Sequence, residues 1–105
     1  MTATIAKTYI EEQIAIFERI HNSFPKLSIY DSFLAYDAAN EIWVTLHVLY
    51  DIRSELKGAE SQQHVMEALA LIQDDYQNAI PAACRVRENV ENAFRRISEA
   101  VKSLY

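Results

Sequence analysis

Glycine is almost absent from this sequence of 105 residues, which contains a single one, Gly58. β-Hairpin turns and bulges need residues that tolerate a positive φ, and loops that cradle phosphates need glycines that let backbone amides approach the ligand. The shortage therefore argues against an all-β fold. It also excludes a P-loop and a glycine-rich dinucleotide-binding fingerprint.

Cysteine is equally scarce, and long apolar runs are missing. Cys84 is the only cysteine, so no internal disulfide can form and no oxidising compartment is implied. The first residues lack the basic start and the apolar stretch of a secretion signal. The longest runs without a charge, Ile42 to Tyr50 and Tyr76 to Cys84, are about half as long as a membrane span. These features predict a cytoplasmic protein that does not enter a membrane.

Basic residues are outnumbered, since 10 Lys and Arg stand against 15 Asp and Glu, for a net charge of −5. Residues 1 to 84 carry −7 and residues 85 to 105 carry +2. The basic residues of that last part, Arg85, Arg87, Arg95, Arg96 and Lys102, alternate with glutamates. The pattern predicts an exposed face of ion pairs and argues against nucleic-acid binding. An acidic body instead suits a basic protein partner.

The first segment has the apolar spacing of an amphipathic helix. One half of its helical wheel holds Ile5, Tyr9, Ile10, Ile14, Ile16, Phe17, Ile20 and Phe24. The other half is polar. The pattern predicts a helix that ends before Pro25.

A second helix is predicted after a cap at Asp31 or Ser32, and it runs to about Lys57. Gly58 follows that lysine and suits the left-handed position at which many helices stop. The middle, Ile42 to Tyr50, is rich in β-branched and aromatic residues and also resembles a strand. Helical flanks without turn residues favour the helix. Because it is apolar on nearly every side, we expect this helix to be buried, with Trp43 between helices or subunits.

The third apolar stripe is the most regular in the chain, and its phase does not change at Pro81. Its members are Val65, Leu69, Ile72, Tyr76, Ala79, Ala83, Val86, Val90, Phe94, Ile97, Val101 and Leu104. Two separate helices would have independent phases, so this continuity favours one long helix that starts near a cap at Ser61 and kinks at Pro81. The alternative is a break at Pro81, which gives four helices of similar length.

These patterns predict an all-α fold in one domain, residues 1–105. The expected architecture is an antiparallel bundle of three helices with the third long and kinked at Pro81, or of four helices if the chain breaks there. An unbroken third helix would overhang its shorter partners and leave an apolar stripe uncovered. We therefore predict a homodimer in which each overhang packs against the other subunit.

The residues proposed for contacts between chains share an apolar or aromatic character, apart from one amide. They are Gln13, Tyr36, Trp43, His47, Tyr50, Val90, Phe94, Ile97 and Val101. Gln13 is included because it lies near the centre of an apolar arc, where a buried amide often fixes register or partner choice.

Residues with catalytic or metal-binding chemistry are few. Glu18 and His21 have the Glu-x-x-His spacing of di-iron bundles, but the motif occurs once where two copies are needed. His47 precedes Asp51 by one helical turn without a recognisable nucleophile. Cys84 is interpreted as a half-buried apolar residue unless the chain breaks at Pro81, which would place it at a helix start.

No motif assigns the chain to a known family or identifies a catalytic residue, a metal ligand or a cofactor site. We therefore expect a small, non-enzymatic interaction or regulatory protein that acts through protein–protein contacts. The alternative is a metal-binding or enzymatic helical bundle that uses His21, His47 and nearby carboxylates.

Overall fold

The structure is a computed structural model that describes residues 3–27 and 32–105. Side chains of residues 24–27, 32–38 and 85 are not part of that description, so the predicted interface residue Tyr36 lies outside the described residues. The described chain forms α1 (Thr4–Leu27), α2 (Ser32–Leu56), α3 (Gln62–Ala79) and α4 (Arg85–Ser103). The all-α prediction is confirmed. Within these ranges, no helix is long and apolar enough to cross a lipid bilayer.

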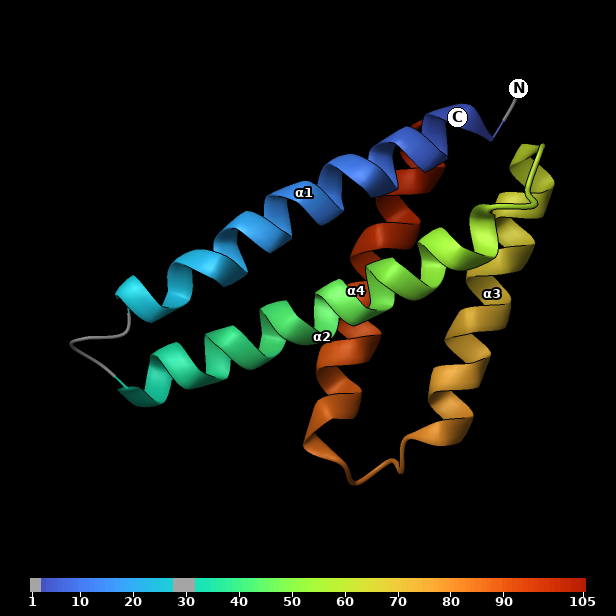
Figure 1. Ribbon diagram of the computed structural model, residues 1–105. Coiled ribbons are helices and arrows are strands. Elements are labelled where there is room, and N and C mark those ends of the chain that lie inside the picture. The colour runs from blue at the N-terminus through green and yellow to red at the C-terminus, as the bar shows by residue number, and fades with distance from the viewer. Residues whose placement is uncertain (1–2, 28–31) are drawn as a thin grey trace.

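The four helices form two antiparallel hairpins that cross each other (Figure 1). α1 and α2 run side by side, and α3 and α4 form the second hairpin against them. α2 contacts all three other helices, whereas α1 contacts mainly α2. The far end of the first hairpin, where α1 ends and α2 begins, projects beyond the second hairpin. The molecule is accordingly elongated, with extents of 47 × 30 × 21 Å.

The continuous third helix predicted from the sequence is wrong, and the four-helix alternative is correct. Proline disfavours helical angles at the residue before it, and Ile80 is extended, with φ −106° and ψ 120°. The chain becomes helical again after Cys84, where α4 begins. Cys84 is exposed rather than half-buried. Arg87 donates from Nη1 to the Ile80 carbonyl at 3.1 Å and so satisfies an acceptor freed by the break. The continuous phase is therefore no sign of one helix, because α3 and α4 each turn their own apolar side toward the core.

Because α4 folds back, the chain covers its own C-terminal stripe. Val90, Phe94, Ile97 and Val101 are at most 5% exposed and belong to the core. Phe94 packs edge-on against Tyr76, with ring centroids 5.3 Å apart. The overhang that led us to predict a homodimer therefore does not form, and these four residues are not on the surface.

Four smaller expectations concern helix ends. Ser61 caps α3 as predicted, since its hydroxyl accepts a hydrogen bond from the His64 amide at 3.2 Å. The first helix was predicted to end before Pro25, but α1 continues to Leu27, because a proline in the last turn removes only one main-chain donor. Gly58 does not have the left-handed conformation expected of it. Of the cap predicted at Asp31 or Ser32, Asp31 lies outside the described residues, and α2 begins at Ser32.

α2 is buried on most sides because three helices pack around it, but the expectation that Trp43 would be covered within the chain is wrong. Val48, Leu49 and Ile52 are fully buried, while Trp43 is 52% exposed. Thr45 is a buried polar residue whose hydroxyl donates to the Glu41 carbonyl at 2.9 Å, which satisfies it locally.

The contrast between two aromatic residues is testable. Phe94→Ala should destabilise the protein by about 3–5 kcal/mol, because it leaves a cavity in the core. Trp43→Ala should cost only about 1 kcal/mol, since half of the indole is already in water. Urea unfolding of both variants measures the difference. Equal losses would contradict the exposed position of Trp43.

Gly58 offers a second test. A Cβ built at this residue meets no atom within 4 Å, and the residue does not have a positive φ. Gly58→Ala should therefore stabilise the protein by about 0.4–1 kcal/mol, because alanine restricts the unfolded chain. A lower melting temperature in thermal unfolding would count against this backbone geometry.

Candidate functional site

The outer side of α2 carries a row of aromatic side chains in mutual contact. Trp43 and His47 are one turn apart, and their ring centroids lie 3.9 Å from each other. The His47 ring meets the edge of Tyr50, with centroids 6.5 Å apart. Trp43 and His47 are exposed and Tyr50 is half-buried. These three predicted interface residues therefore share one accessible surface.

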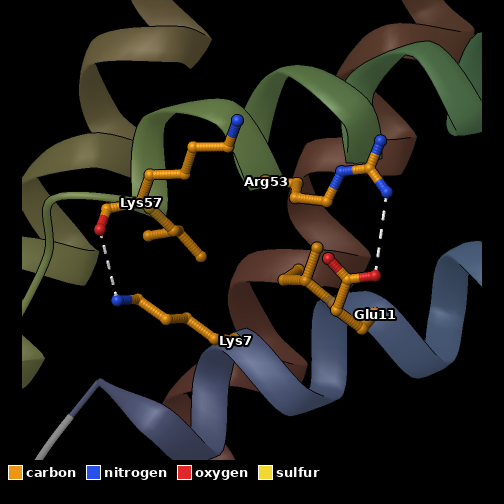
Figure 2. Close-up of a pocket in the computed structure, with 6 residues that line it drawn as sticks. Lys7, Glu11, Arg53 and Lys57 are labelled. Carbon is orange, nitrogen blue, oxygen red and sulfur yellow. Dashed lines mark hydrogen bonds and ion pairs between the residues drawn. The ribbon is translucent and has the colours of Figure 1, made fainter.

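Basic side chains continue the row toward the end of α2. The Arg53 guanidinium lies over the Tyr50 ring, 5.1 Å from its centroid, within the range of a cation–π contact. Lys57 follows immediately after the helix, and Lys7 of α1 lies opposite (Figure 2). We name Trp43, His47, Tyr50, Arg53, Lys57 and Lys7 together the aromatic–basic strip.

A small pocket of about 150 Å³ opens between α1 and α2 at the basic end of the strip. The buried side chains of Ile10 and Leu56 line it together with the charged residues. Figure 2 shows the Lys7 amine directed toward the Lys57 main-chain carbonyl, and this distance is 3.5 Å. The same lysine thus stabilises the negative end of the α2 dipole.

The charges around this pocket are mostly positive. Arg53 forms an ion pair with Glu11 at 3.7 Å, and both side chains are about half exposed. Since solvent screens such a pair, its contribution to stability is small. Lys7 and Lys57 leave a local excess of positive charge in a chain whose net charge is −5. An acidic group is the complementary ligand for this end of the strip.

Tyr50 joins the two helices at the middle of the strip. Burial raises the pKa of its hydroxyl, and the charge of Glu18 and a hydrogen bond with it raise that pKa further, while Arg53 lowers it. The phenol therefore stays protonated at neutral pH. Glu18, which sequence analysis paired with His21, lies instead beside this tyrosine.

The sequence suggested that Asp51 would pair with His47, but Asp51 bonds to a different residue. The Asp51 carboxylate accepts a hydrogen bond from the Tyr76 hydroxyl of α3. Desolvation raises the pKa of Tyr76 strongly, and Asp51 raises it further through the hydrogen bond and its charge. This bond ties α2 to α3.

The alternative of a metal-binding protein would need a cluster of metal ligands, and the described part of the chain contains none. No three His, Cys, Asp or Glu side chains described by the structure lie close enough together to hold a metal ion. His21 is half-buried on α1 and His47 is exposed in the strip.

Gln13 lies in a different place from the strip. It is half-buried and lines a cavity of about 180 Å³ between α1, α2 and α4, together with Tyr9, Phe17, Thr45, Leu49, Ala93, Arg96 and Ile97. Burial raises the pKa of Tyr9 there. The structure does not bring Gln13 together with Trp43, His47 and Tyr50 on one surface.

Two of the basic residues of α4, Arg87 and Arg96, form ion pairs. Arg87 pairs with Glu91 at 3.1 Å, and Arg96 pairs with Glu41 of α2 at 3.2 Å. A continuous basic surface along α4 is therefore interrupted by carboxylates.

Sequence reasoning missed the basic part of the strip, although some of its signal was present. Arg53 and Lys57 follow Trp43, His47 and Tyr50 at helical spacings of three or four residues, which places them on one side of α2. Lys7 gave no such signal, because its position depends on how α1 and α2 align. No protein family, curated protein or solved structure matches the chain.

Tyr76→Phe tests this connection between α2 and α3, because it removes the hydroxyl and keeps the ring against Phe94. We expect a loss of about 1 kcal/mol at neutral pH, measured by urea unfolding. A pKa raised by folding gives stability that is complete below the ordinary value of 10.0 and is lost as the pH rises above it. The advantage of the wild type over this variant should therefore shrink above that pH, and a constant difference would refute the role of the hydroxyl.

Proposed function

We propose that this chain is a small interaction protein that acts through protein–protein contacts in the cytoplasm, and that the aromatic–basic strip is its contact surface. The observation that carries the proposal is the contact of Trp43, Tyr50 and Arg53, directly or through His47, on one accessible side of α2. Tryptophan, tyrosine and arginine are the residues most enriched among those that dominate binding energy at protein interfaces.

Exposure of the indole adds to this argument. A tryptophan that is 52% exposed leaves a large apolar area in water, and a partner that covers it gains free energy. The ring contacts also restrict Trp43, His47 and Tyr50 before binding, which lowers the entropy lost when a partner docks. The strip is therefore an organised surface.

The charge of the chain makes nucleic acid a less suitable partner than a protein. Glu11 and Glu18 lie beside the basic residues of the strip, and the chain as a whole is acidic, so nucleic acid is the less suitable ligand. A cytoplasmic setting fits the exposed, unpaired Cys84, since free thiols persist in reducing compartments.

Pairwise removal of the strip's anchors tests the proposal. The full chain carrying Trp43→Ala and Arg53→Ala should lose the proteins that cross-link to the wild type in nuclease-treated extract of the source cells. A matched control, Val86→Ala with Arg95→Ala, removes an exposed apolar and an exposed basic side chain from α4 and should keep those partners.

Three results would contradict the proposal. The first is an identical set of cross-linked proteins for the wild type and both double variants. The second is the absence of any cross-linked protein. The third is stoichiometric iron, manganese or zinc in the purified protein, which would favour the metal-binding alternative with His21 and His47.

A further inference from the structure

The cavity between α1, α2 and α4 has no part in the proposed function, because none of the residues of the aromatic–basic strip lines it. Its volume is about 180 Å³. We propose that this cavity binds a small neutral molecule, about the size of one aromatic ring with one hydrogen-bonding group. Such a site would give the chain a ligand of its own, in addition to any protein partner.

The crossing of the two hairpins leaves this space between the helices. α1 packs along α2 but has few contacts with α4, which crosses the α1–α2 hairpin (Figure 1). On the α4 side, the buried Ala93 lines the cavity and has too small a side chain to fill it. On the α1 side, Tyr9, Gln13 and Phe17 line the cavity and are only half-buried. A small molecule can therefore enter past α1.

The size and the walls of the cavity suit one aromatic ring. A closed apolar cavity of about 150 Å³ is large enough to hold benzene. Here Leu49 and Ile97 provide buried aliphatic walls, and Tyr9 and Phe17 add two aromatic rings. Aromatic rings attract one another in offset or edge-on arrangements. Mostly apolar walls with a small number of polar groups are typical of sites for small molecules.

The polar groups of the wall have unused hydrogen-bonding capacity. Among the hydrogen bonds between described residues, none involves the Gln13 amide or the Tyr9 hydroxyl. Thr45 is the one buried polar side chain that the structure describes. Its hydroxyl donates to the Glu41 carbonyl, and the same oxygen can still accept a hydrogen bond. A polar group on a bound ring needs a partner once it leaves water, and these side chains can provide one.

The charges at the cavity favour a neutral ligand. Arg96 is the one charged residue among the described residues that line it. Its guanidinium pairs with the Glu41 carboxylate at 3.2 Å, and both side chains are about half exposed, so the pair lies near the solvent. A charged ligand would lose its hydration among apolar walls without a free counter-charge to replace it. The same ring without a charge avoids this cost.

Phenol and benzoate test the site, because they share a ring and differ in charge at neutral pH. In titrations of the full chain by calorimetry, phenol should bind saturably at one molecule per chain and benzoate at least about tenfold more weakly. In methyl NMR spectra, bound phenol should shift the signals of Leu49 and Ile97 and leave those of the exposed Leu71 on α3 unchanged. Saturating phenol should also raise the melting temperature.

Substitutions in the wall test the two parts of the ligand separately. Ala93→Leu puts a larger apolar side chain into the cavity and should abolish phenol binding. Gln13→Met with Tyr9→Phe removes the unused polar groups and keeps similar volumes. This variant should bind phenol about fivefold more weakly, as expected for one lost hydrogen bond, and toluene as tightly as the wild type. Gln77→Met with Tyr50→Phe makes the same changes outside the cavity and should leave both affinities unchanged.

The inference is overturned if phenol does not bind saturably up to its solubility limit, if the shifts appear elsewhere than at Leu49 and Ile97, or if benzoate binds equally well. Circular dichroism checks that each variant folds. If Ala93→Leu does not fold, the double variant decides, and an unchanged preference for phenol over toluene would refute the site. Trp43→Ala with Arg53→Ala should bind phenol like the wild type, so failure of the cavity site and failure of the proposed function are separate results.

Discussion

The ring of Pro81 disfavours helical angles at Ile80, which is extended, and much of the architecture follows from this break. Because α3 stops there, α4 folds back across α2 and brings Phe94 into the core. A continuous helix would have left that stripe for another subunit to cover. The break leaves the Ile80 carbonyl without a main-chain donor. The Arg87 side chain donates a hydrogen bond to it and so offsets this loss.

Burial in this fold is organised around α2, which packs against all three other helices. Its middle was ambiguous in the sequence because an apolar stretch without clear periodicity fits a strand as well as a buried helix. The structure resolves the ambiguity through position, with Val48, Leu49 and Ile52 fully buried. Among its described side chains, Trp43 and His47 are left exposed, which the wheel of one helix cannot predict.

Helix content and most helix limits were predictable because they depend on local signals such as the Ser61 cap and the scarcity of glycine. The break at Pro81 was harder, because the apolar stripes of α3 and α4 share one phase across the loop between them, a coincidence that the sequence alone does not distinguish from one continuous helix. The candidate site was predictable in its aromatic half. Its basic half needs Lys7 of α1 opposite Lys57, a contact between residues fifty positions apart.

A domain of this size cannot cover every apolar side chain, so single exposed residues such as Ile5 or Val86 need no functional explanation. Trp43 differs from them in its surroundings, because its ring contacts His47 and the row continues through Tyr50 to the Arg53 guanidinium. Apolar burial supplies attraction without direction, while a charged group beside the apolar rings selects which surface meets them. The combination of both on α2 is what distinguishes a contact surface from an incompletely covered core.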